Sequence, residues 1–175
     1  MKAASDPSPS ETGPRPAELA GHAQWVVFSL DAARFALPLP SVERVVRAVQ
    51  VTRLPAAPAV VLGAIDVQGR VLPVFNVRHR FGLPQRDIDP ADQFVIARSA
   101  ERSVVLVVDA AQGVLHSLPT DTIAAASIAS GLEQLRGVIR LPDGLVLIPD
   151  LNLFLSAAET RALDKALKRG ASHAG

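Results

Sequence analysis

Four histidines are the first candidates for acid–base chemistry or metal binding in this sequence. A histidine titrates near neutral pH and often binds zinc, but both roles need a second suitable group at a defined spacing. His22 and His173 lie near the two ends of the chain, and His116 follows a predicted strand without such a neighbour. His79 stands between two arginines, whose positive charges disfavour an imidazolium and repel a metal ion. The histidines therefore predict neither a catalytic site nor a metal site.

Three aspartates in the segment DIDPAD, namely Asp87, Asp89 and Asp92, could begin a calcium-binding loop. Such a loop also needs a central glycine and a glutamate at its twelfth position, and both are missing here. We therefore interpret the segment as a solvated turn. A serine nucleophile elbow, a phosphate-binding glycine loop and a dinucleotide fingerprint are also missing from the sequence. The sequence predicts no enzymatic activity and no cofactor.

The amino-acid composition narrows the classes of protein to which the chain could belong. The chain has 175 residues with 18 basic and 17 acidic side chains, six Phe, one Trp and no Tyr. Nucleic-acid binding is disfavoured because the arginines are scattered and few aromatic side chains are available for base stacking. There is no cysteine, and the apolar runs are far shorter than the roughly 20 residues that cross a bilayer. Without an N-terminal apolar signal segment, the expected location is the cytoplasm.

The elements that must position any site are short, valine-rich strands. Residues 1–24 are rich in Pro, Ser, Ala and Gly and predict a disordered tail. From Trp25 onward, apolar runs separated by turn residues predict strands, with a short turn leading into a strand at Ser41–Val49. Ser156 and Glu159 form a capping-box pattern that predicts a C-terminal helix.

Two hairpins with similar sequences stand about 75 residues apart. Gly63-Ala64-Ile65 is followed by a turn and Val71-Leu72, and Gly137-Val138-Ile139 is followed by a turn and Val146-Leu147. This internal similarity suggests two lobes of like construction. In the first hairpin, Pro73 lacks an N–H group and therefore predicts an edge or bulge position.

Four blocks in order resemble the CheW family, the adaptor proteins of bacterial chemotaxis-type signalling. The resemblance extends from about Trp25 to Leu155. The blocks are VVFSLDAARFALPLPSVERVV, VTRLPAAPAVVLGAIDVQGRVLPVFNVRHRFGLP, SVVLVVDAAQGVLHSLP and LRGVIRLPDGLVLIPDLNLFL.

The resemblance implies an all-β fold of two small five-stranded barrels of the SH3 or OB type, with a hydrophobic groove between them and a C-terminal helix. The implied organisation is a tail at 1–24, one CheW-like domain at 25–156 and the helix with a short tail at 157–175. We expect the lobe boundary near residue 83, with strands exchanged between the lobes.

The resemblance also implies a function without catalysis. Proteins of this family couple the cytoplasmic tip of a methyl-accepting chemoreceptor to the regulatory domain of the histidine kinase CheA. A protein of this kind is cytoplasmic and reaches the membrane only through the receptor array. The sequence does not identify the kinase-binding residues.

The family resemblance also implies, by matching positions, which residues of this chain face the receptor. The resemblance implies that Val42, Gly63, Val114 and Gly137 contribute to the receptor-binding groove. For the two valines the alternative is core packing, and for the two glycines it is backbone geometry.

The chain departs from the family at the tip of the first hairpin. Family members usually carry Asn-Leu-Arg-Gly where this chain has Asp66-Val67-Gln68-Gly69. The arginine of that motif often pairs with a glutamate, and here Gln68 and Arg44 occupy the two positions. Arg70 could restore part of the lost positive charge. Since such residues act on partner choice more than on folding, we expect an adaptor of an accessory pathway with its own receptor.

Two other interpretations remain open at this stage. A small β-barrel could instead bind a ligand or an oligonucleotide, because a fold does not fix a function. The chain could also be part of a larger fusion with a phosphoacceptor receiver domain, although it has no acidic phosphoacceptor pocket.

Overall fold

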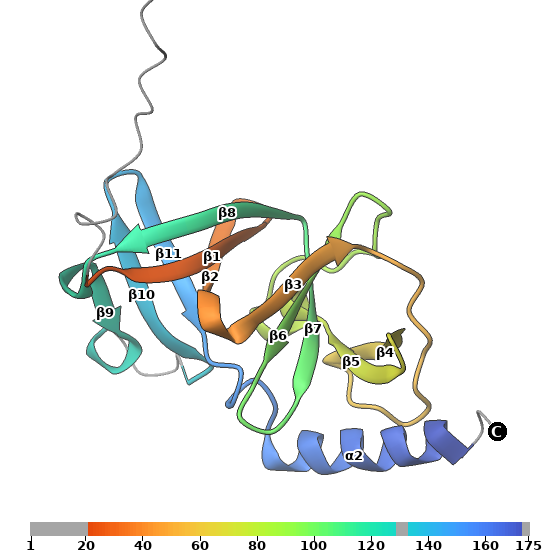
Figure 1. Cartoon of the computed structure of the whole chain (residues 1–175). Coiled ribbons are helices and arrows are strands. Elements are labelled where there is room, and N and C mark those ends of the chain that lie inside the picture. The colour runs from red at the N-terminus through yellow and green to blue at the C-terminus, as the bar shows by residue number, and fades with distance from the viewer. Residues whose placement is uncertain (1–20, 129–132, 173–175) are drawn as a thin grey trace, which may run out of the picture.

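The computed structural model describes residues 21–128 and 133–172, which form two β-sheet lobes and a C-terminal helix (Figure 1). The predicted tail at 1–24 falls almost entirely outside these ranges, although the first strand already begins at Ala23. The first sheet contains β1 (Ala23–Leu30), β2 (Ala33–Pro38), β8 (Ala110–Ser117), β9 (Thr122–Ala124), β10 (Leu135–Leu141) and β11 (Gly144–Pro149). The second contains β3 (Val42–Arg47), β4 (Val61–Val67), β5 (Arg70–Phe75), β6 (Gln93–Arg98) and β7 (Ser103–Val108).

The predicted mainly-β fold with two lobes and a C-terminal helix is confirmed, with two differences of detail. The strand order is β8-β1-β2-β11-β10-β9 in the first lobe and β3-β6-β7-β5-β4 in the second. The first lobe thus has six strands instead of five, because the short strand β9 pairs with β10. Neither described hydrogen-bond ladder closes into a complete barrel, since β8 and β9 end one sheet and β3 and β4 end the other.

The described strands change lobe twice along the chain. The first crossing is the short helix η1 (Leu39–Ser41), and the second follows β7 at Asp109. The second lobe is therefore one continuous segment, while the first lobe combines strands from both ends of the domain. The expectation was a lobe boundary near residue 83 with strands exchanged between the lobes; in the described strands the changes of lobe lie at residues 39–41 and at Asp109.

The two similar hairpins are β4–β5 and β10–β11, and each adds a parallel strand pair to its sheet. β5 pairs with β7 at Val74 and Phe75, and β11 pairs with β2 at Leu147. Of the predicted edge or bulge position for Pro73, the edge is wrong, because β5 is flanked by β4 and β7. A bulge does interrupt the β4–β5 ladder next to Pro73, between Val61 and Gly63. The missing N–H of Pro73 is tolerated because the ladder to β7 covers only Val74 and Phe75.

One hydrophobic core crosses the lobe junction and receives the C-terminal helix α2 (Ala157–Ser172). Phe28 and Phe35 of the first lobe belong to the same buried cluster as Phe75 of the second lobe and Leu163 of α2. The predicted capping box is present, because Ser156 and Glu159 exchange hydrogen bonds of 2.8 and 3.1 Å. Further short helices are α1 (Val77–Arg80), η2 (Pro119–Asp121) and η3 (Ala125–Ser127). Figure 1 shows α2 running along the second lobe.

Candidate functional site

A groove of about 320 Å³ lies where the two lobes meet. The first lobe contributes apolar surface through Leu37, Pro38 and Pro149, and the second lobe contributes the turn between β6 and β7. The remaining lining residues are Pro40, Ser41, Arg98, Ser99, Ala100, Arg136, Asp150, Leu151 and Asn152. The groove thus combines an apolar surface with charged side chains from both lobes.

The two arginines of this groove, Arg98 on β6 and Arg136 on β10, are exposed. Neither guanidinium donates a hydrogen bond or forms an ion pair within residues 21–128 and 133–172. Arg136 is the extra residue of a β-bulge, because Leu135 pairs with Pro149 and Gly137 pairs with Ile148. A bulge redirects the side chain that it inserts, which explains how a strand residue comes to line a groove between lobes.

Asn152 ties the segment after β11 to the turn between β6 and β7. Its side-chain oxygen accepts a hydrogen bond of 2.8 Å from the backbone N–H of Ala100. Asp150 accepts one of 2.9 Å from the backbone N–H of Asn152. The only acidic side chain among the groove's lining residues is therefore already engaged with backbone.

A second polar group, called the tip cluster here, comprises Glu43, Arg44, Gln68, Arg70 and Ser103. It begins at the turn between β4 and β5, where Gln68 and Gly69 both have positive φ values of 53° and 83°. Two such residues form the tight hairpin turn that matches the twist of the strands. Asp66 supports the turn by accepting a hydrogen bond of 2.8 Å from the Gly69 N–H.

The tip cluster brings together Arg44 and Gln68, the two positions where the chain departs from the CheW pattern that it resembles. Arg44 Nη2 lies 3.5 Å from Gln68 Oε1, so the family's charge pair is replaced by a long hydrogen bond. A charge pair is present one position away, because Arg70 Nη2 lies 2.8 Å from Glu43 Oε2. Ser103 donates a hydrogen bond to the other Glu43 oxygen. Glu43 is the extra residue of a bulge in β3, which re-aims its side chain.

Electrostatics favour the ionised form of Glu43. The hydrogen bond from Arg70, followed by that from Ser103, holds the pKa of Glu43 below its ordinary value. The positive charge of Arg98 makes a smaller contribution in the same direction. The tip cluster and the groove are therefore electrostatic neighbours.

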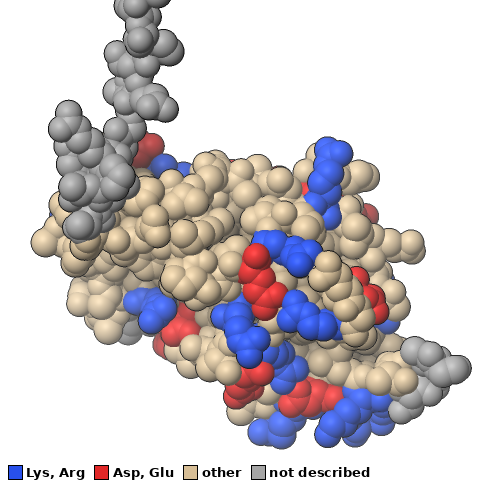
Figure 2. All heavy atoms as spheres, viewed as in Figure 1, with Lys and Arg blue, Asp and Glu red and all other residues tan. Residues whose placement is uncertain are grey.

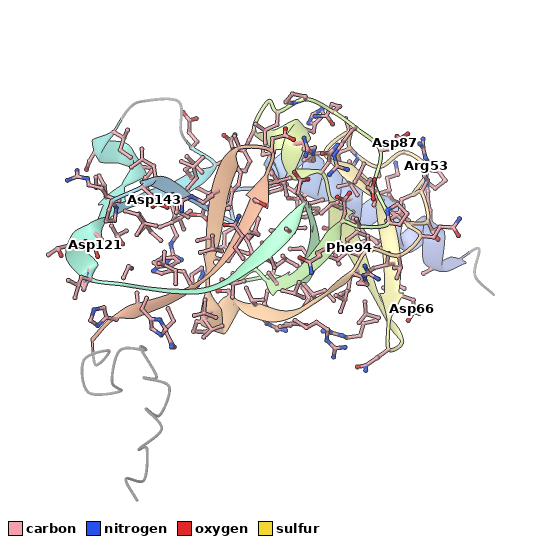
Figure 3. The ribbon with its side chains drawn as sticks, turned by 90° about the horizontal axis from the view of Figure 1, so that it is seen from above. Arg53, Asp66, Asp87, Phe94, Asp121 and Asp143 are labelled. Atoms are coloured by element: carbon pink, nitrogen blue, oxygen red, sulfur yellow. The ribbon has the colours of Figure 1, made fainter. Side chains whose placement is uncertain are left out.

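Figure 2 shows that charged side chains gather over the second lobe and α2 on the visible face, while the first lobe is mostly uncharged there. Figure 3 places Asp66 at the far end of the second lobe, well away from Asp121 and Asp143 in the first. The hairpin tip is thus an outward-facing part of the molecule.

A third polar group, the Arg78 cluster, comprises Asp31, Arg78, Arg86, Asp92 and Asp109. Arg78, only 7% exposed, donates to Asp31 at 2.7 and 3.0 Å and to Asp109 at 2.8 and 3.0 Å. Arg86 donates to Asp92 at 2.7 and 2.8 Å and to Asp109 at 2.6 Å. Because Asp31 lies in the β1–β2 turn and Arg78 in α1, this cluster joins the two lobes.

The carboxylates of the Arg78 cluster are stabilised in their charged form. The hydrogen bond from Arg78 lowers the pKa of Asp31, and the hydrogen bonds from Arg86 lower the pKa of Asp92. For Asp109, burial alone would raise the pKa, but the Asp31 N–H and Arg78 donate hydrogen bonds that lower it overall.

The structure places two of the four carried-over residues beside the groove. Val42 follows the lining residue Ser41, and Gly137 follows Arg136. Val42 is partly buried and packs against the core that joins the lobes. Val114 lies elsewhere, 51% exposed on the edge strand β8, where it faces a separate pocket of about 190 Å³.

Gly63 and Gly137 occupy equivalent positions in the two hairpins, and both have a structural reason to be glycine. A Cβ atom on Gly63 would lie 2.1 Å from the Thr52 carbonyl oxygen. One on Gly137 would lie 2.5 Å from the Ile123 carbonyl oxygen. Each contact is closer than real Cβ atoms tolerate, so both hairpins depend on a close backbone approach that only glycine permits.

The histidines and aspartates first considered as catalytic or metal-binding residues do not lie together in one site. Within the described ranges no group of three or more His, Asp or Glu side chains is placed to hold a metal ion. Asp92 pairs with Arg86, and Asp89 accepts a hydrogen bond of 2.7 Å from the Ala91 N–H. His173 lies outside the described residues.

A pocket of about 560 Å³ lies in the second lobe between segments 48–53 and 86–90. Figure 3 shows Arg53 and Asp87 close together at this side of the lobe. None of the helices among the described residues is long and apolar enough to span a membrane.

Sequence reasoning missed Arg98 and Arg136 as groove residues, and it missed the Arg78 cluster. Arg136 precedes a glycine that was singled out, and that spacing is the one signal that could have drawn attention to it. The Arg78 cluster joins residues up to 78 positions apart in the chain, and no local pattern announces such an arrangement.

Known proteins match this chain over both lobes. The family model described as CheW-like domain matches residues 24–159. The chemotaxis protein CheW of Treponema pallidum is 23% identical over 146 residues, which cover 80% of this chain and 86% of that protein. The chemotaxis protein CheW of Rhizobium meliloti is 26% identical over 144 residues, covering 81% of this chain and 93% of that protein.

A solved structure agrees with the fold. The scaffolding protein TtCheW from Thermoanaerobacter tengcongensis superposes with a TM-score of 0.73 at 23% sequence identity, covering 79% of this chain and 95% of that chain. The family model spans both lobes and reaches the first turn of α2. The chain belongs to the CheW-like domain family.

Proposed function

We propose that this protein is a non-catalytic adaptor that couples the cytoplasmic tip of a methyl-accepting chemoreceptor to a CheA-type histidine kinase. The observation that carries the proposal is the match to the CheW-like family model across residues 24–159, which includes both lobes and the groove between them. Relatives with chemotaxis names cover most of the chain. An adaptor of this kind acts in the cytoplasm, at receptor arrays.

The tip cluster supports a specialised version of this role. Where the family usually pairs an arginine with a glutamate, this chain presents Arg44 and Gln68, and it forms a displaced pair between Arg70 and Glu43. Exposed charge pairs contribute little to folding but set register and exclude wrong partners at an interface. We therefore assign the protein to an accessory chemosensory pathway with its own matched receptor.

The alternative of a ligand-binding or oligonucleotide-binding barrel receives no support. The related proteins carry chemotaxis and scaffolding names. On the visible face, basic side chains alternate with acidic ones instead of forming a continuous basic strip (Figure 2), and single-stranded nucleic acid requires such a strip.

The proposal is tested by titrating the full chain with two purified partners from the same organism. These are the soluble cytoplasmic fragment of each chemoreceptor and the regulatory domain of each CheA-type kinase. We expect one receptor fragment and one kinase domain to bind with micromolar affinity, the range of transient signalling contacts. Equal binding to the receptor of the main chemotaxis pathway would contradict the accessory assignment. Binding to neither partner would contradict the adaptor role.

A further inference from the structure

The turn between β6 and β7, residues 99–102, forms part of one wall of the groove between the lobes. This turn is closed on itself by hydrogen bonds between its first and last residues. The Ser99 N–H and hydroxyl donate to the Arg102 carbonyl oxygen at 2.8 and 2.9 Å, and the Arg102 N–H donates to Ser99 Oγ at 3.1 Å. A turn closed in this way moves as one unit, so links from other segments decide where it lies relative to the first lobe.

Side chains of the C-terminal segment that follows β11 hold this turn at two points. Asn152 Oδ1 accepts a hydrogen bond of 2.8 Å from the Ala100 N–H. Asp164 on α2 forms an ion pair with the Arg102 guanidinium and accepts a hydrogen bond from it. Because β11 belongs to the first lobe and the turn to the second, the segment 150–164 fastens a groove wall of one lobe to the end of the other.

The C-terminal segment is itself anchored on the second lobe. Phe154 is fully buried and stacks on Phe75, with ring centroids 5.0 Å apart. Glu159 accepts a hydrogen bond of 2.6 Å from Arg80, and Leu163 is fully buried in the core that crosses the lobe junction. These anchors lie between the two links in the sequence, so the segment gives both links a fixed support.

We infer that residues 150–164 act as a clasp that fixes the separation of the groove walls, with Asn152 and Asp164 as its positioning residues. The inference goes beyond the proposed function, since it concerns the geometry of the groove itself. The side chains of Arg102 and Asp164 are 25% and 44% exposed, and ion pairs this exposed contribute little to folding. Their effect is on position, because a groove whose walls are already in place loses less conformational entropy when a partner docks.

The two links of the clasp differ in their relation to the family. The match to the family model ends at residue 159, whereas α2 continues to Ser172. Asn152 therefore lies inside the matched domain, and Asp164 lies beyond it. The clasp thus joins the helix that follows the matched domain to the groove within that domain.

The test measures the separation of the groove walls in the full chain. Because the sequence has no cysteine, Glu101→Cys and Arg136→Cys place two unique spin labels at exposed positions, one in the turn and one on the first lobe. Double electron–electron resonance of this labelled parent chain should give one narrow distance distribution. Adding Asn152→Ala and Asp164→Asn should broaden the distribution about twofold, since a segment with few remaining contacts samples more positions.

Further variants separate the clasp from a general effect on α2. Lys165→Gln changes an exposed side chain next to Asp164 on the same helix and should leave the distribution narrow. Asp164→Arg alone should broaden the distribution, because it places two positive charges together. Combining it with Arg102→Asp reverses the ion pair and should restore the narrow distribution. Circular dichroism of each variant should match that of the parent chain, since an exposed pair contributes little to folding.

The outcomes that contradict the clasp are distinct. A distribution that stays narrow without both links would overturn the inference. Equal broadening by Asp164→Arg alone and by the reversed pair would mean that the ion pair does not position the turn. Loss of the circular dichroism signal in the variant without both links would make these residues determinants of folding instead of position. The measurements use neither receptor nor kinase, so a failure of the clasp leaves the proposed adaptor function standing.

Discussion

The Arg78 cluster and the tip cluster both pair arginine with a carboxylate, but they differ in the burial of their central arginine. Arg78 is 7% exposed and lies between the lobes, with carboxylates from both sides. In the tip cluster, the side chain of Arg70 is 49% exposed and its partner Glu43 is 26% exposed. A buried guanidinium without partners is costly, whereas an exposed one is solvated by water.

Because of this difference, we expect the Arg78 cluster to serve folding and the tip cluster to serve recognition of a partner. The Arg78 cluster holds the β1–β2 turn against α1 and the loop that follows it, so it contributes to the relative position of the lobes. In the tip cluster Arg44, Gln68 and Arg70 are exposed, so a change of charge at these side chains leaves the core untouched. Sequence departures from the family at such a position alter partners before they alter stability.

The largest effect is expected from Arg78→Ala. Removing the buried guanidinium leaves Asp109 with Arg86 as its remaining ion partner, while the 46% exposed Asp31 is solvated by water. The loss therefore comes from the charge-assisted hydrogen bonds and packing of Arg78 itself, and we expect the free energy of unfolding to fall by about 2 kcal/mol. Urea denaturation followed by circular dichroism measures this change. The control is Arg140→Gln, an exposed side chain on β10, which should change stability by less than about 0.5 kcal/mol. An equally small effect of Arg78→Ala would remove the distinction between the two clusters.

Low pH should weaken the ion pairs of the Arg78 cluster and so reduce their contribution to stability. The pKa values of Asp31 and Asp109, the two carboxylates that accept hydrogen bonds from Arg78, lie below the ordinary 3.8 in the folded protein, so their contribution to stability is present above that pH. It is lost as the pH falls through the lower folded-state values. The stability difference between the wild-type chain and Arg78→Ala should therefore be largest at neutral pH and shrink below about pH 4. Urea midpoints at pH 7 and pH 3 measure it, and a constant difference would contradict this reasoning.

Arg70→Gln should have a small effect on folding. An exposed ion pair contributes about 0–1 kcal/mol, and Glu43 keeps its hydrogen bond from Ser103. Urea denaturation should therefore place this variant within 1 kcal/mol of the wild-type chain. A loss as large as that of Arg78→Ala would mean that the tip cluster is structural.

The smallest effect on stability is expected from the double variant Arg44→Glu with Gln68→Arg, which restores the family's charge pair. Both side chains are exposed, so the free energy of unfolding should change by less than about 0.5 kcal/mol. Affinity should shift toward the receptor of the main chemotaxis pathway and away from the matched receptor. Competition binding with the two receptor fragments measures the shift. An unchanged preference would mean that Arg44 and Gln68 do not determine which receptor is bound.

Much of the fold could be predicted because its signals are local. Valine-rich runs separated by turn residues predicted the strands, and the capping box at Ser156 predicted the start of α2. Gly63 and Gly137 marked two equivalent hairpins, and the structure explains both by a carbonyl oxygen that occupies the space of a Cβ atom. The six-stranded lobe could not be predicted, because β9 has only three residues and no distinctive pattern.

The candidate site was less predictable because it is assembled from distant segments. Arg44 and Gln68 were identified by comparison with a family pattern, and the structure places them in contact. Arg98 and Arg136 belong to different lobes and meet only through the crossing of the chain. That these two arginines line one groove is a property of the folded structure alone.

The adaptor role is tested most directly by asking whether this chain is required to bring receptor and kinase together. Receptor fragments assembled on vesicles are sedimented with the CheA-type kinase in the presence and absence of the chain, and the kinase in the pellet is quantified. We predict that the kinase sediments with the matched receptor only when the chain is present. Equal recovery of the kinase with and without the chain would contradict the adaptor role.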